Sequence, residues 1–97
     1  MKTKRVWLTG EDGKEAIVTM NVADDPYNDY RPYHMAVGHT SSGVVPLCRL
    51  RWKRIRVVNL ETETWTIRWE AVTCPRCLAL RSREAEIIAE ALEAAHV

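Results

Sequence analysis

The stretch Val72-Thr73-Cys74-Pro75-Arg76-Cys77-Leu78 decides the fold, because it places two cysteines where an apolar helical pattern begins. Pro75 fits the first turn of a helix, where its missing N–H costs no hydrogen bond, so Thr73 or Cys74 is the expected N-cap. The two thiols converge there, beside the free N–H groups and the positive end of the helix dipole. That environment stabilises thiolates, the form of cysteine that binds zinc.

The residues that follow this stretch repeat with a helical period. One face is apolar and the opposite face is acidic, which predicts an amphipathic C-terminal helix over residues 78–97. The apolar face comprises Leu78, Ala85, Ile88, Leu92 and Ala95, widened by Leu80, Ile87 and Ala91, and the acidic face comprises Glu84, Glu86, Glu90 and Glu93.

The residues that precede the cysteine pair carry strand signals. Residues 6–9 and 16–22 flank a turn with two glycines, which predicts a β-hairpin. Residues 34–43 suggest a connection or a weak strand with a turn, and residues 44–50 and 54–60 have extended patterns. Apolar and polar residues alternate over 65–71, which predicts a strand joined to 54–60 by a turn at 59–64. The expected fold class is therefore α+β, with a small antiparallel sheet and a C-terminal helix.

Zinc needs two further ligands, and the chain offers Cys48 and three histidines. Cys48 is the expected third ligand. His34 precedes an apolar segment that can be buried beside the helix start, so it is the preferred fourth ligand, and His39, in a Gly/Ser-rich segment, is the alternative. A continuous helix would place His96 about 28 Å from Cys77, too far to take part.

Two other interpretations of the cysteines compete with a structural zinc site. A Cys-Pro-x-Cys sequence at a helix start also occurs in glutaredoxin, but a thioredoxin-like fold needs most of its sheet after the motif. Only twenty residues follow Cys77, which argues against redox catalysis. The other alternative is that the cysteines are small core residues with no shared role.

Three segments together resemble a known family: His34-Met35-Ala36, Pro46-Leu47-Cys48 and the stretch 72–78. They are similar to small uncharacterised zinc-finger-like proteins of actinobacteria and their phages, whose pattern runs His-Leu-Ala, Leu-Cys-Gly and Val-Thr-Cys-Pro-x-Cys-Leu. The resemblance covers residues 34–90, and Arg49 departs from it where the family usually has glycine. It implies zinc ligands at His34, Cys48, Cys74 and Cys77. A cysteine pair that leads into a helix also looks treble-clef-like or zinc-ribbon-like, although the spacing from His34 to Cys48 is wide.

Length and composition predict one zinc-binding domain over residues 1–97. Its expected parts are a hairpin with a tyrosine-rich loop (1–33), a zinc core (34–77) and a helix (78–97). No apolar run approaches the ~18 residues that span a bilayer, and no signal-peptide pattern follows the basic N-terminus. The expected compartment is therefore cytoplasmic, where thiols stay reduced and clustered cysteines more often bind metal than pair.

A basic strip between Cys48 and Val58 suggests nucleic-acid binding. An extended chain would place Arg49, Arg51 and Lys53 on one face, where they would track phosphates, while Trp52 on the other face would stack on a base. The alternative is that these residues solvate a half-buried strand and pair with Glu61, Glu63 and Glu70 of its neighbour. The predicted nucleic-acid-binding residues are Arg49, Arg51, Trp52, Lys53, Arg54 and Arg56.

An acidic, tyrosine-rich segment over residues 24–33 suggests a different partner. Its tyrosines and arginine are typical of protein contact surfaces, and the phage resemblance implies a host protein as partner. Catalysis has little support, because four protein ligands leave zinc no open position and the chain has no Ser-His-Asp order or P-loop. We therefore expect a non-enzymatic zinc protein that binds nucleic acid or acts as a regulatory accessory protein, with a phage–host protein interaction module as the alternative.

Overall fold

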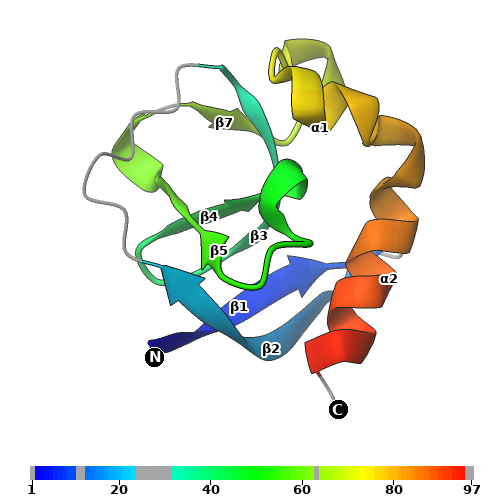
Figure 1. Ribbon diagram of the computed structural model, residues 1–97. Coiled ribbons are helices and arrows are strands. Elements are labelled where there is room, and N and C mark those ends of the chain that lie inside the picture. Colours follow the sequence, from blue (N-terminus) through cyan, green and yellow to red (C-terminus); the bar gives the residue numbers. More distant parts are fainter. Residues whose placement is uncertain (1, 11–12, 24–31, 63, 96–97) are drawn as a thin grey trace.

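The computed structural model describes residues 2–10, 13–23, 32–62 and 64–95. Within these residues, seven strands form one sheet: β1 (Thr3–Thr9), β2 (Glu15–Ala23), β3 (His34–His39), β4 (Gly43–Pro46), β5 (Ile55–Arg56), β6 (Val58–Asn59) and β7 (Trp65–Thr66). The helical elements are the 3-10 turns η1 (Leu47–Arg49), η2 (Leu60–Thr62), η3 (Trp69–Ala71) and η4 (Arg81–Arg83) and the helices α1 (Pro75–Ala79) and α2 (Glu84–Ala95) (Figure 1).

The sheet has the strand order β5-β2-β1-β3-β4-β6, and β7 pairs with the start of β3. The pairs β1·β2, β1·β3, β3·β4 and β4·β6 are antiparallel, whereas β2·β5 and β3·β7 are parallel. The α+β class with a C-terminal helix is confirmed. The expectation of an antiparallel sheet holds only in part, because two short strands arrive from distant loops and join it in parallel.

The predicted N-terminal hairpin is present and longer than expected. β1 and β2 pair in continuous register from Thr3 opposite Asn21 to Thr9 opposite Glu15. The turn is closed by a hydrogen bond from the Gly13 N–H to the Gly10 carbonyl, and Gly13 has a φ of 79°, a conformation that favours glycine. Side chains alternate between the two faces of each strand, and the apolar residues Val6, Leu8, Val18 and Val22 lie on the face that is buried against the rest of the core.

Two strand predictions in the middle of the chain are wrong. Residues 47–50 form η1 and a turn instead of continuing β4. The hairpin between 54–60 and 65–71 is also absent from the described residues, because β6 pairs with β4 and β7 pairs with β3. After β7 the Arg68 N–H bonds the Thr66 hydroxyl and the chain bends, so Ile67 points outward with 73% of its surface exposed.

The C-terminal helical segment is divided in two. α1 begins with Cys74 as N-cap and Pro75 in its first turn, as the sequence predicts, and Leu80 ends it. The expected apolar face is confirmed in α2, where Ile87, Ile88 and Ala91 are buried. The prediction that Leu78 belongs to this apolar face is wrong. Leu78 lies in α1 and is 44% exposed, because η4 turns the chain between the two helices. None of the helices in the described ranges is long and apolar enough to cross a membrane.

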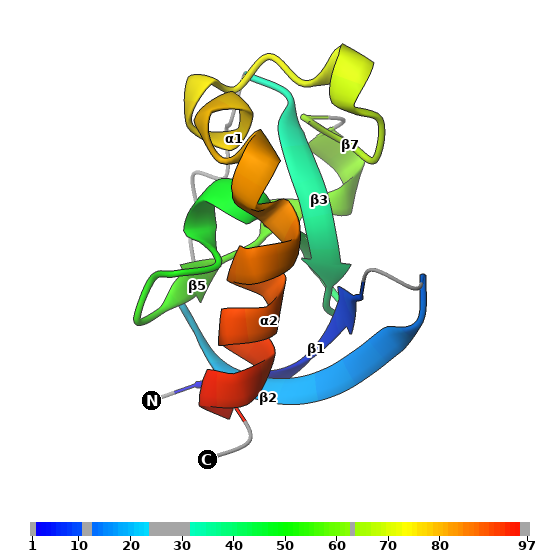
Figure 2. The same ribbon diagram turned by 90° about the vertical axis from the view of Figure 1, so that its right-hand side faces the viewer.

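One hydrophobic core joins the sheet to the helices. α2 crosses the inner face of β1 and β2, while α1 and η1 cover the beginning of β3 (Figure 2). The buried apolar residues of these layers are contiguous, and they include Cys74 and Cys77. The cysteines therefore lie where strand and helix layers meet.

We expect Gly43→Ala to destabilise the chain by about 1–3 kcal/mol, because the first residue of β4 has no space for a side chain. A Cβ at Gly43 would overlap the Val58 carbonyl oxygen and lie 3.1 Å from its carbonyl carbon, both fixed by the β4·β6 pairing. Chemical denaturation measures the loss. The exposed neighbour Ser41→Ala is the matched control, and equal stability of the two variants would contradict the close packing.

Candidate metal centre

Four side chains from separate elements meet in one cluster. His34 begins β3, Cys48 lies in η1, Cys74 caps α1 and Cys77 lies in its first turn. One ligand atom from each residue, all four within 4.8 Å of one another, forms a group that could hold a metal ion. His34, Cys74 and Cys77 are buried, and Cys48 is partly exposed.

The histidine presents its Nδ1 atom to the sulfurs. Nδ1 lies 3.5 Å from the Cys48 Sγ and 3.9 Å from the Cys77 Sγ. The imidazole therefore contacts two of the three thiols, and the third, that of Cys74, lies within 4.8 Å.

Backbone bonds hold the start of β3 against the start of α1. The Tyr33 carbonyl accepts hydrogen bonds from the N–H groups of Thr73 and Cys74, each 3.0 Å long. The Tyr33 N–H in turn donates to the Thr73 hydroxyl at 2.8 Å. On the other side the His34 N–H donates to the Thr64 carbonyl at 3.0 Å. These bonds fix His34 and Cys74 relative to each other through their neighbours.

Without a cation, the thiols shift one another's protonation in opposite directions. The pKa of Cys77 is lowered to about 4, first because the Cys48 thiol donates a hydrogen bond to its sulfur, while burial opposes the shift. The pKa of Cys48 is raised far above its usual range by that same hydrogen bond, by burial and by the negative charge on Cys77. A second thiolate is therefore costly here unless a positive ion accompanies it.

The alternative histidine ligand, His39, lies at the far end of β3. Its ring stacks on Trp7 with centroids 5.2 Å apart, and its Nε2 lies 3.3 Å from the Glu15 Oε1. His39 is not part of the His–Cys cluster. His96 lies outside the described residues.

The basic strip has a different shape from the predicted one. Because η1 and a turn replace an extended chain, Arg49 does not share a face with Arg51 and Lys53. Its guanidinium instead lies 4.6 Å from the ring centroid of Trp52, over the indole. Arg51, Trp52, Lys53, Arg54 and Arg56 are exposed.

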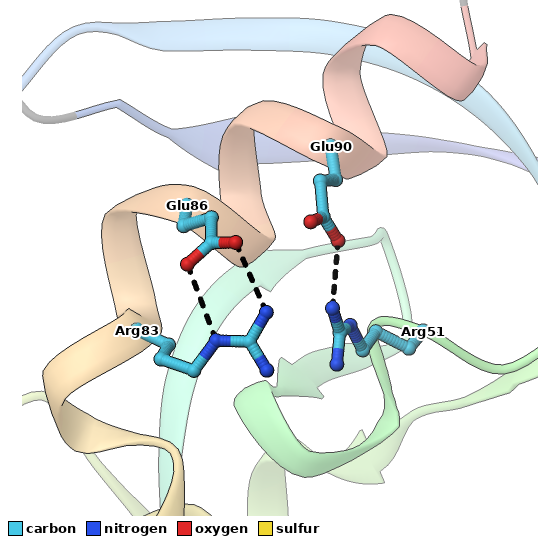
Figure 3. A network of polar contacts seen from close by, with 4 residues as sticks. All are labelled: Arg51, Arg83, Glu86 and Glu90. Atoms are coloured by element: carbon cyan, nitrogen blue, oxygen red, sulfur yellow. Dashed lines mark hydrogen bonds and ion pairs between the residues drawn. The ribbon is translucent and has the colours of Figure 1, made fainter.

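One arginine of the strip is paired across the molecule. The Arg51 Nη2 lies 3.0 Å from the Glu90 Oε2 of α2, rather than pairing with the acids of the neighbouring strands (Figure 3). Figure 3 also shows Arg83, which binds both carboxylate oxygens of Glu86 one turn along the helix. Both pairs are exposed, so water and salt weaken them.

The acidic, tyrosine-rich segment lies largely outside the described residues. Of residues 24–33 the structure describes only Pro32 and Tyr33, both exposed. The proposed protein contact at this segment stays a prediction.

Sequence reasoning missed one surface feature, a groove between β2, the turn after η1 and α2. Its lining comes from segments far apart in sequence, of which the nearest residues are Asn21 and Leu50, and the sequence predicts a strand where the turn lies. The signal in the sequence was the apolar residue at every even position from Ala16 to Val22, which predicts a long strand whose two edges both need hydrogen-bond partners.

Comparisons with protein-family models, with curated proteins and with solved structures found no match to this chain.

Proposed function

We propose that His34, Cys48, Cys74 and Cys77 bind one zinc ion. Zn–S bonds of about 2.3 Å and Zn–N bonds of about 2.0–2.1 Å in a tetrahedron separate nitrogen from sulfur by about 3.6 Å. The two Nδ1–Sγ distances in the cluster, 3.5 and 3.9 Å, lie on either side of that value. This agreement is the observation that carries the proposal. Thiolate and imidazole ligands are also those that zinc prefers over magnesium or calcium.

We assign the ion a structural role. Four protein ligands complete a tetrahedron and leave no position for a reactive water, which supports a non-enzymatic protein. Two ligands lie at the start of α1, as in treble-clef-like or zinc-ribbon-like sites, and the other two come from β3 and η1. The ion would therefore hold the helical layer to the sheet.

Native mass spectrometry of the purified chain tests the metal proposal. We expect one zinc ion per chain, and we expect Co²⁺ substitution to give the absorption of a tetrahedral thiolate site. A fully folded wild-type chain without metal would contradict it.

The zinc site would serve to display the basic strip to nucleic acid. Cys48 immediately precedes Arg49, so a bound ion would fix the turn that carries the strip. Lys53 and Arg54 are exposed on this turn, where they can contact phosphates, and Arg56 is exposed on β5. Trp52, with Arg49 stacked on its ring and 41% of its surface exposed, offers a base a stacking surface.

We expect binding of a single-stranded oligonucleotide to weaken steeply with salt and to depend on the strip. Lys53→Ala and Arg54→Ala should each reduce the slope of log K against log salt by about 0.7, the value for one phosphate contact with a single strand. Trp52→Ala should cost about 1–3 kcal/mol of binding free energy. Fluorescence anisotropy at several salt concentrations measures both effects.

Arg68→Ala is the matched control, because Arg68 is an exposed arginine outside the strip. Binding that ignores salt, or that falls equally in the control, would contradict a nucleic-acid role. A host protein that stays bound to the chain after nuclease treatment would favour the alternative, a phage–host interaction module.

A further inference from the structure

A groove of about 490 Å³ lies beside the outer edge of β2. Buried apolar side chains of Leu50, Ile87 and Ala91 form part of its lining, and Trp52 and Lys53 line it from the turn after η1. In Figure 2 this turn lies on one side of α2, and β2 passes below the C-terminal half of the helix. The groove is therefore bounded by a strand edge, a helix and a basic turn.

The strand edge beside the groove has unused backbone groups. The Val22 N–H donates to the Lys2 carbonyl. The backbone N–H and C=O groups of even-numbered residues of β2 therefore point to β1, and those of odd-numbered residues point to the outer edge. β5 covers this outer edge only at Val22 and Ala23. Among the described residues, no strand pairs with the outward N–H and C=O groups of Ile17 and Thr19.

This edge also has few of the features that protect exposed strands. Natural edge strands carry proline, charged side chains (lysine above all) or a bulge, or are very short. Residues 15–21 contain no proline and no lysine, their one charged residue is Glu15 at the start, and their register with β1 is continuous. Ile17, in the middle of this stretch, has 52% of its surface exposed. An open, regular, partly apolar edge is a template for an added strand.

We propose that β2 binds an acidic peptide in extended conformation, which adds to its outer edge as a further strand. Alternate peptide side chains would enter the groove and contact the accessible apolar residues of its lining, Met20, Trp52 and Ala94, while the peptide backbone pairs with Ile17 and Thr19.

The charges around the edge select an acidic peptide. Arg5 is exposed and lies opposite Thr19 on β1, and Lys53 lines the groove. Glu90, the acidic side chain in the lining, is already paired with Arg51. The side chains around the edge therefore carry an excess of positive charge, which can pair with the carboxylates of a partner.

The backbone chemistry favours a peptide over nucleic acid at this edge. Along the outer edge, an outward-pointing N–H and C=O pair recurs at every second residue, about every 6.8 Å, which matches the spacing of the same groups in an extended peptide. A phosphodiester backbone offers acceptors but no donors, so it would leave the Ile17 and Thr19 carbonyls unpaired. The inference depends neither on the zinc ion's identity nor on nucleic-acid binding by the strip.

Amide hydrogen exchange of the zinc-loaded full chain tests the proposal. The probe is a capped nonapeptide in which glutamate alternates with valine, and its lysine counterpart tests the charge preference. We expect the glutamate peptide to slow exchange at the Ile17 and Thr19 amides and the lysine peptide to bind about tenfold more weakly.

A proline at the outer edge separates strand addition from simple charge attraction. Thr19→Pro removes an outward N–H and no bond to β1, so we expect about a tenfold loss of peptide binding, whereas Thr19→Val should bind as wild type does. If Thr19→Pro perturbs the fold, the same peptide with an N-methyl group on every residue supplies the test, because it has no N–H group on either edge to donate to β2.

Three results would overturn the proposal. The glutamate peptide might leave both amides unprotected, or its N-methylated form might bind equally well. An oligonucleotide that protects the Ile17 and Thr19 amides when the peptide does not would assign the edge to nucleic acid.

Discussion

Removing the metal with a chelator is expected to unfold the chain. The proposed site joins β3, η1 and α1, and Cys74 and Cys77 are themselves part of the core. Structural zinc sites contribute about 10–16 kcal/mol, which is comparable with the total stability of about 5–15 kcal/mol of a native protein. We expect loss of the cooperative thermal transition on chelation and its return when zinc is restored, measured by circular dichroism and calorimetry.

Two histidine variants provide the matched test of this result. His34→Ala removes the imidazole of the cluster, so we expect it to lose zinc and the cooperative transition. His39→Ala removes a surface imidazole that stacks on Trp7, and we expect it to retain one zinc ion and lose about 1 kcal/mol or less. The reverse pattern would show that His39 is the ligand.

Acidification is expected to destabilise the zinc-bound chain steeply. The bound state holds three thiolates, whereas the unfolded chain protonates each thiol below pH ~8.5 and its imidazole below pH ~6.5. Between pH ~6.5 and pH ~8.5 the unfolded state therefore binds three more protons, and stability at fixed free zinc should fall by about 4 kcal/mol per pH unit. Below pH ~6.5 the imidazole adds a fourth proton, and the slope should rise to about 5.4 kcal/mol per pH unit. In the cluster without a metal, the lowered pKa of Cys77 acts with the same sign, since its contribution to stability is complete above the ordinary thiol pKa and is lost toward about 4.

Denaturation at buffered free zinc measures this slope, and calorimetry counts the protons released on zinc binding. We expect about three protons near neutral pH. His39→Ala should show the same slope, which excludes the surface histidine as its source. Stability that is constant over this range, or release of one proton or fewer, would contradict a three-thiolate site.

The local features of this chain could be predicted from its sequence. The start of α1 was identified because Pro75 and the cysteine pair act within a single turn. The β1–β2 hairpin was identified because its turn and alternation are adjacent in sequence. His34 could be preferred over His39 because its apolar neighbours Met35 and Val37 indicated burial.

The pairing of the short strands could not be predicted in this way. β5, β6 and β7 have two residues each, too few for periodicity to specify a partner. The positions of these strands depend on contacts with distant residues, such as the hydrogen bond that the Thr64 carbonyl, just before β7, accepts from the His34 N–H. The shape of the basic strip was missed for a related reason, because Cys48 meets the other ligands from a 3-10 turn and not from a strand.

If His34, Cys48, Cys74 and Cys77 bind one ion, we expect their spacing along the chain to affect the order in which the protein folds. Cys74 and Cys77 are close enough to hold an ion before any tertiary structure exists, whereas His34 is 43 residues from Cys77 and 14 from Cys48. The entropy of closing a loop grows only slowly with its length, so both remaining ligands can be recruited by ring closure onto an ion already held. A metal captured early would therefore act as a nucleus that selects the pairing of distant segments.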